Sequence, residues 1–134
     1  MPDIRTRDDV DTVTKISGRS VGDTVARLTE LVAAKGMRLF AVIDQAAEAR
    51  KVGLQLRDTI MVIFGSPVAG TPVMVAAPLA ALDLPLKVLV WADGKQTKVS
   101  YDAPAAIARR RGLSPELAAN LAGINALTDA LVTP

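Results

Sequence analysis

The stretch 59-TIMVIFGSPVAGTPVMVAAPLAALDLPLKVLVW-91 decides the fold of this chain. It begins with the apolar run 59–65 and ends with a second one at 84–91. In both runs the two alternating sets of side chains are hydrophobic, and Lys87 is the one charge. Strands with this pattern are buried on both faces, so we expect two interior strands of one sheet.

The segment between these strands contains two overlapping helix-start signals. Ser66 precedes Pro67 and Thr71 precedes Pro72, and each pair places a capping hydroxyl before a proline at the first helical position. A proline deep inside a helix costs a backbone hydrogen bond. We therefore predict a short helical turn at 67–70 and a separate helix over 72–77.

Outward from this stretch, hydrophobic periodicity and capping signals predict the remaining elements. These are a strand at 12–17, a helix from Ser20 to Gly36, a strand at 37–44, a short helix capped by Asp44, a hairpin at Asp93-Gly94 with its return strand, and helices at 103–111 and 114–132. The last helix carries a stripe of Leu117, Leu121, Ile124, Leu127 and Leu131.

The element order β-α-β-α-β-α-β-β-α-α predicts an α+β (α/β two-layer) domain. We expect a mixed sheet of about five strands, with parallel crossovers, a final antiparallel hairpin and helices mainly on one face. Residues 12–134 are predicted to form a single domain behind a loose N-terminal tail, 1–11. If the other face were bare, the terminal helix or a second subunit would have to cover it.

Several motifs together resemble one known family. They are FGSPVAGTPVM and DLPLKVLVW in the deciding stretch, VSYDAP after it, and FAVIDQAAEARKVGLQLRDT before it. This combination resembles the bacterial family catalogued as domain of unknown function 302, over roughly Thr12 to Gly112. The resemblance implies a compact α/β unit that tends to dimerise, and it implies no activity. Many members carry a histidine after the aspartate of the second strand, where this chain has Gln45 after Asp44.

Composition excludes several classes of chemistry. The chain has no cysteine and no histidine, which removes disulfides, thiolate catalysis and the usual transition-metal ligands. Carboxylates could still hold a hard cation, but no metal site is predicted. No nucleotide or cofactor motif is present, and no cofactor is expected. The charged N-terminus lacks the apolar core of a signal peptide, and the run 72–82 has about half of the roughly 20 residues that a membrane span needs. We predict a cytoplasmic, soluble protein without a membrane segment.

The net charge of +2 is too small to indicate an electrostatic partner. The run Arg109 to Arg111 falls at the predicted end of a helix, where cations complement the helix dipole. Nucleic-acid binding needs a broader basic face with interleaved aromatic residues. No nucleic-acid partner is therefore predicted.

The glycine-rich turn from Phe64 to Pro72 is the first candidate site. Free N–H groups at a helix start favour anions, and ligands of open α/β sheets gather beyond strand ends. Ser66, Gly70 and Thr71 are therefore candidate ligands for a small anion. The alternative is that the glycines only permit tight turns.

Lys87 is the second candidate, because a lysine in an apolar strand can serve as a base or bind an anion. Asp44 and Asp102 are its candidate carboxylate partners, while Trp91 and Tyr101 are candidate walls of the pocket. The alternatives are a lysine whose head reaches water, an aspartate that only caps a helix, and aromatic residues that only pack.

We therefore predict a homodimeric domain that binds a small anionic ligand at the Phe64–Pro72 turn and Lys87. One alternative is a structural or protein-interaction module whose terminal leucine stripe docks a partner. Another is an acid–base enzyme with Lys87 as its base and Asp44 or Asp102 as partner. The sequence does not decide whether the protein is an enzyme.

Overall fold

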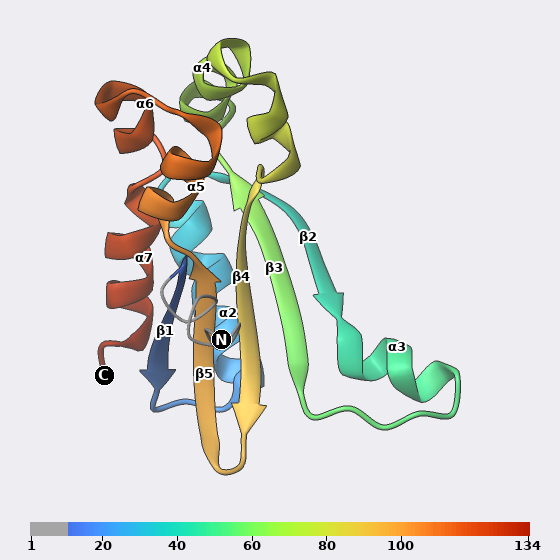
Figure 1. The fold of residues 1–134 in the computed structure, drawn as a ribbon. Helices are drawn as coiled ribbons and strands as arrows, with labels where there is room; N and C mark the ends of the chain where they lie inside the picture. Colours follow the sequence, from blue (N-terminus) through green and yellow to red (C-terminus); the bar gives the residue numbers. More distant parts are fainter. Residues whose placement is uncertain (1–10) are drawn as a thin grey trace, which may run out of the picture.

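A computed structural model describes residues 11–134 and shows a five-stranded sheet with helices on one face and at both ends (Figure 1). The strands lie in the order β1-β5-β4-β3-β2. Their bounds are β1 Thr12–Ser17, β2 Arg38–Asp44, β3 Thr59–Gly65, β4 Leu86–Asp93 and β5 Gln96–Asp102. The α+β class and the five strands confirm the prediction, and β3 and β4 are both interior.

Every pair of neighbouring strands is antiparallel, so the predicted mixed sheet with parallel crossovers is wrong. Strands β1 and β2 do run in the same direction, but they form the two opposite edges of the sheet. Between β2 and β3, and between β3 and β4, the connecting helices lie beyond the strand ends (Figure 1). A helix between two strands thus need not cross the sheet face, and the helix pattern alone cannot show which route it takes.

The main core lies between the sheet and two helices, α2 (Val21–Ala34) and α7 (Gly123–Val132). Ser20 caps α2 as predicted and accepts a hydrogen bond from the Asp23 amide at 3.1 Å. Each fully buried aliphatic side chain contributes about 1.5–3 kcal/mol. The buried members include Leu28, Val32, Val62, Phe64, Val88, Val90, Val99, Leu127 and Leu131.

The predicted terminal helix over 114–132 is broken into α6 (Pro115–Ala119) and α7. The residues of its leucine stripe belong to two hydrophobic clusters. Leu121 packs at the end of the sheet with Val73, Ala80 and Ile107. The stripe residues on α7 pack in the main core. The turn between the helices makes both packings possible. Most of the stripe is buried within the chain, so the idea that it docks a partner is wrong.

One continuous helix, α4 (Pro67–Ala76), replaces the predicted turn and second helix, and a 3-10 helix, η1 (Pro78–Leu82), follows it. Pro72 lies inside α4. A proline there leaves the carbonyl four residues earlier, on Val68, without its helical donor. Val68 is 87% exposed, so water can supply that hydrogen bond. We call α4 and η1 together the cap.

A second projection leaves the opposite end of β2. It consists of α3 (Gln45–Lys51) and the following loop to residue 58, and we call residues 45–58 the arm (Figure 1). Asp44 begins α3 by accepting a hydrogen bond from the Ala47 amide at 2.9 Å.

The predicted N-terminal tail 1–11 lies outside the described residues except for Asp11. The Asp11 carboxylate accepts a hydrogen bond from Arg109 of helix α5 (Pro104–Arg111) at 2.7 Å.

The sheet face opposite α2 has a polar half and an apolar half. In register, Ile43, Met61 and Leu89 lie beside one another on β2, β3 and β4, followed by Ser100 on β5 and Thr14 on β1. Helix α7 shares the other face with α2, so the terminal helix does not cover this one. Among residues 11–134, the apolar half that neither α2 nor α7 covers therefore lies toward the β2 edge.

Candidate functional site

Two adjoining cavities lie at the cap end of the sheet. The larger one, the turn cavity, has a volume of about 400 Å³. Its walls come from α4, from Leu84 and Pro85 before β4, from the start of β2 and from the α6–α7 turn. Nearly all of its lining is apolar, and Lys35 is the one charged side chain among the described residues that line it.

The predicted anion-binding residues Ser66, Gly70 and Thr71 all line this turn cavity. Ser66 caps α4, since its side chain accepts from the Ala69 amide at 3.3 Å and its carbonyl accepts from the Gly70 amide at 2.8 Å. Pro67 has no N–H to offer. An anion at the helix start would compete with Ser66 for these amides, so the turn serves mainly as a wall of the cavity.

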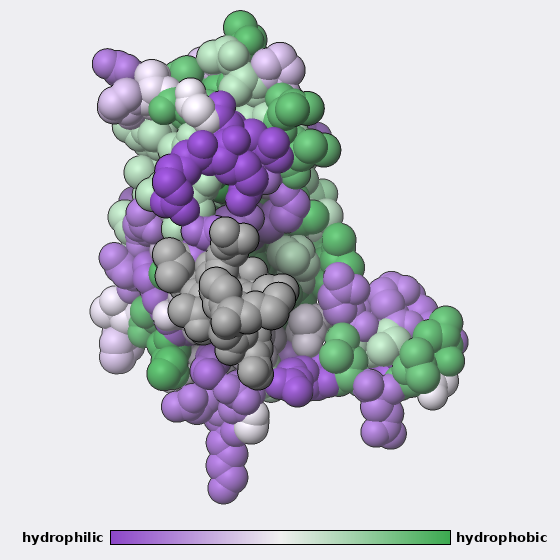
Figure 2. All heavy atoms as spheres, in the orientation of Figure 1, coloured by the Kyte–Doolittle hydropathy of each residue, from purple (hydrophilic) through white to green (hydrophobic). Residues whose placement is uncertain are grey.

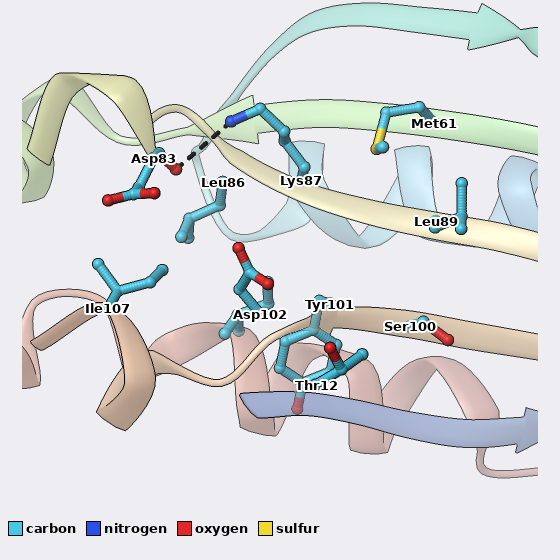
Figure 3. Close-up of a pocket in the computed structure, with 11 residues that line it drawn as sticks. Thr12, Met61, Asp83, Leu86, Lys87, Leu89, Ser100, Tyr101, Asp102 and Ile107 are labelled. Atoms are coloured by element: carbon cyan, nitrogen blue, oxygen red, sulfur yellow. Dashed lines mark hydrogen bonds between the residues drawn. The ribbon is translucent and has the colours of Figure 1, made fainter. Parts of the chain in front are cut away.

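The smaller cavity, the strand cavity, arises where β4 and β5 diverge. The two strands are paired as far as Leu89 and Ser100, beyond which β5 continues to Asp102 paired with β1 alone. The resulting opening has a volume of about 220 Å³ (Figure 3). Leu86 and Ile124 line both cavities and so form the shared wall.

Lys87 lines the strand cavity, but its ammonium is directed to the backbone before β4 (Figure 3). Its Nζ donates to the Pro85 carbonyl at 2.9 Å and to the Asp83 carbonyl at 3.4 Å. Asp102 lines the same cavity and is exposed, with Arg110 at 3.8 Å from its carboxylate. Within residues 11–134, Lys87 forms no ion pair with a carboxylate.

Asp83 lines the strand cavity and links the cap to helix α5. Its carboxylate accepts from Arg111 at 2.7 Å and from Arg110 at 3.0 Å, and its side chain is 12% exposed. Partial burial raises the pKa of the Asp83 carboxyl, but the hydrogen bonds from Arg111 and Arg110 outweigh it, so the pKa lies below its usual value. Arg109, Arg110 and Arg111 thus form ion pairs with carboxylates of the same chain.

Of the other predicted site residues, Tyr101 joins Lys87 and Asp102 on the strand cavity, whereas Trp91 and Asp44 lie apart from it. Tyr101 contributes its ring to the strand cavity, while its hydroxyl donates to Asn125 of α7 at 2.7 Å. Trp91 lies further along β4, where its indole N–H donates to Ser100 at 3.0 Å, and it lines neither cavity. Asp44 caps α3 at the arm end of β2, far along the sheet from Lys87.

Sequence reasoning missed Lys35, Phe40, Leu84 and Asn120, which line the turn cavity. Asn120 donates to the Ala69 carbonyl at 3.1 Å and so ties the α6–α7 turn to α4. Leu84 belongs to the DLPLK motif, which is the local signal that could have found it. The other three come from segments distant in sequence, and no local pattern marks them.

Within the described part of the chain, no three histidine, cysteine, aspartate or glutamate residues are grouped so that they could hold a metal ion. None of the helices found in residues 11–134 has both the length and the apolarity needed to cross a membrane.

The antiparallel sheet, the one-sided helices and the helical cap define an α+β domain whose sequence matches a known family. The chain belongs to the family described as "Domain of unknown function DUF302", which it matches over residues 13–131. A crystal structure titled as an uncharacterised conserved protein DUF302 from Bacillus stearothermophilus has the same fold. That structure has a TM-score of 0.78 at 19% identity and covers 91% of this chain and 95% of its own.

Curated relatives also match, over part of their length. The chain is 37% identical over 109 residues to proteins named Fluoride-specific ion channel FluC 1 from Brucella suis and from Brucella abortus. The matched region covers 79% of this chain but 43% and 40% of those relatives. The chain thus spans less than half the length of the curated relatives that it matches.

Proposed function

We propose that this protein is a cytoplasmic, homodimeric domain that binds a small anionic ligand with an apolar body in the turn cavity. The observation that carries the proposal is the cavity itself, whose volume of about 400 Å³ is built on the Phe64–Pro72 turn. Small-molecule sites are concave, mostly apolar and carry a few polar groups that orient the ligand. The turn cavity has this character.

The position of Lys35 favours a ligand that carries an acidic group. Lys35 is exposed at the C-terminal end of α2 and is the one charged side chain on the described lining. A ligand carboxylate or sulfonate at the mouth can pair with its ammonium while the apolar body fills the interior. Asn120 and Thr71 add polar groups beside the apolar walls.

The cytoplasmic location rests on the cysteine-free sequence, because secreted domains of this size commonly carry disulfides.

A pair of fluorescent probes tests both features of the proposed ligand. Anilinonaphthalene sulfonate carries a negative charge, while N-phenyl-1-naphthylamine has the same aromatic body without it. We expect the wild-type protein to enhance the fluorescence of both probes in titrations at pH 7. Lys35→Gln should weaken sulfonate binding by about two- to fivefold, the range for an exposed ion pair, and leave amine binding unchanged.

Two further variants complete this test. Ala69→Phe places a ring in the cavity and should abolish binding of both probes, while circular dichroism reports that the fold is kept. Lys95→Gln removes another exposed lysine, in the β4–β5 turn, and should bind both probes like the wild type. Undiminished binding by Ala69→Phe would show that the probes lie elsewhere, and equal effects of the two lysine variants would exclude a specific role for Lys35.

The acid–base alternative has less support from the geometry. Lys87 donates to two backbone carbonyls and thereby anchors the segment that precedes β4. Of its two candidate partners, Asp44 is used as a helix cap and Asp102 lies nearer to Arg110. These contacts describe a structural lysine, so the binding function is the one that we put forward.

A further inference from the structure

The exposed apolar side chains gather on the cap, on β2 and on the arm, and Figure 2 shows hydrophobic residues over the cap at the top and over the arm at the lower right. Of the twelve large hydrophobic residues that are exposed within residues 11–134, all but Ile16 belong to β2, the arm or the cap. They are Leu39, Phe40, Val42 and Ile43 on β2, Val52, Leu54 and Leu56 on the arm, and Val68, Val75, Leu79 and Leu82 on the cap. Exposed apolar surface gathered in this way marks an interaction site.

Strand β2 lies at the centre of this surface and forms an edge of the sheet. It pairs with β3 along one side, and no described strand pairs with its other side. The start of β2, Arg38, lies in register with Gly65 beside the cap, and its end, Asp44, leads into the arm. The sequence of surfaces along this edge is therefore cap, β2, arm (Figure 1).

This arrangement is complementary to itself under a two-fold axis. An axis through the middle of β2, at Ala41, reverses the strand and places each cap against the arm of the other copy, so that apolar surface meets apolar surface. The same operation places Arg38 of one copy opposite Asp44 of the other, which pairs opposite charges. A surface that matches its own rotated copy is what a two-fold homodimer requires.

The size of the surface also favours a second copy over a short peptide. A stable interface needs about 800 Å² and 20–30 residues from each partner. Strand β2 supplies only seven residues, so strand pairing by itself falls short. The arm and the cap together provide the remainder, and a second copy brings a matching arm and cap.

We propose that two copies of this chain associate along β2, with the arm of each copy packed on the cap of the other. This inference rests on the homodimer in the proposed function and is independent of the ligand. The register of β2 shifts between Leu39 and Ala41, and such a bulge bends an edge strand away from regular pairing. The contact is therefore made by side chains and does not require a continuous ten-stranded sheet.

The absence of cysteine makes crosslinking a direct test of this interface. Ala41→Cys places one thiol of each copy near the axis, and a short bismaleimide should convert the protein to a covalent dimer. Ile16→Cys is the matched control, because Ile16 is 56% exposed on β1 at the opposite edge, and it should remain monomeric on a denaturing gel.

Light scattering on a size-exclusion column provides the second measurement. Leu54→Asp puts a charge on the arm, where the native side chain is 64% exposed, so the monomer fold is kept. It should weaken the dimer at least tenfold, because the two-fold axis repeats the arm–cap contact twice in one dimer, while Ile16→Asp should leave it intact.

The outcomes separate the two proposals. A wild-type protein that is monomeric at every concentration would overturn the homodimer and this interface together. A wild-type dimer that Leu54→Asp leaves intact and that Ala41→Cys does not crosslink would keep the homodimer and overturn only the interface. The naphthalene probes report on the ligand in either case.

Discussion

The ion pairs of Asp83 give the sharpest stability prediction for this fold. Asp83 follows η1 and binds two arginines near the end of α5, so it joins the cap to the helix behind the strand cavity. Asp83→Asn keeps the size of the side chain and removes its charge. The variant therefore leaves Arg110 and Arg111 without their carboxylate.

The loss of stability expected for Asp83→Asn follows from the burial of the side chains in each ion pair. The pair with Arg111 joins side chains that are 12% and 17% exposed, whereas Arg110 is 38% exposed. A hydrogen bond to a charged group contributes about 1.5–3 kcal/mol when it is buried, and an exposed pair contributes about 0–1 kcal/mol. We expect Asp83→Asn to reduce the free energy of unfolding by about 2 kcal/mol. A chain of this size has an unfolding entropy of about 0.3 kcal/mol/K, so Tm should fall by about 7 °C.

The effect should depend on pH in a defined direction. The pKa of the Asp83 carboxyl is lower in the folded protein than its usual value of 3.8. Ionised Asp83 therefore stabilises the fold fully above pH 3.8, and this stabilisation is lost as the pH falls through the lowered pKa. The difference in Tm between wild type and Asp83→Asn should be constant from pH 5 to 8 and should shrink below pH 4.

Thermal unfolding followed by circular dichroism from pH 2.5 to 8 measures these differences. Asp93→Asn is the control, because a hydrogen bond from Lys98 also lowers the pKa of the Asp93 carboxyl. Asp93 lies in an exposed hairpin, so the shift in Tm of this variant should be much smaller. An Asp83→Asn variant with the Tm of the wild type at pH 7, or with a deficit that persists unchanged at pH 2.5, would refute the reasoning.

Three further predictions concern other parts of the fold. Lys15 joins β1 to α7 through an ion pair of 2.7 Å with Asp129. Burial lowers the pKa of the Lys15 ammonium, but its hydrogen bonds to Asp129 and Tyr101 outweigh burial and raise this pKa above its usual value. The stability that Lys15 provides is therefore fully present below about pH 10.5 and is lost at higher pH. Lys15→Met should flatten the stability curve between pH 9 and 11.5, measured by urea unfolding. Ser66→Ala should cost about 0.5–2 kcal/mol, as for other N-caps, whereas Thr71→Ala, inside α4, should change urea stability little. Leu28→Ala, at a fully buried position, should cost about 2–5 kcal/mol in the same assay, and a loss below 1 kcal/mol would contradict its place in the core.

The candidate site was only partly predictable from the sequence. Ser66, Gly70 and Thr71 are neighbours in one turn, and all three line the turn cavity, while their role as ligands stays a prediction. Lys87 was expected in the same pocket, yet it lines the adjoining strand cavity, and Leu86 is the residue of β4 that lines both cavities. Leu86 forms the shared wall, and Lys87 is directed away from it.

Local chemistry by itself determined where most helices and strands begin and end. Ser20 and Asp44 cap their helices as predicted, Ser114 caps the helix predicted to begin there, and the alternating and doubly apolar runs became the predicted strands. These signals act between residues a few positions apart, so they can be read along the chain. The antiparallel order of the sheet, the continuity of α4 through Pro72 and the break before α7 were decided only by tertiary structure. These three features depend on which distant part of the chain buries the apolar side chains of each segment. The free energy of that packing outweighs the local conformational preference of the segment.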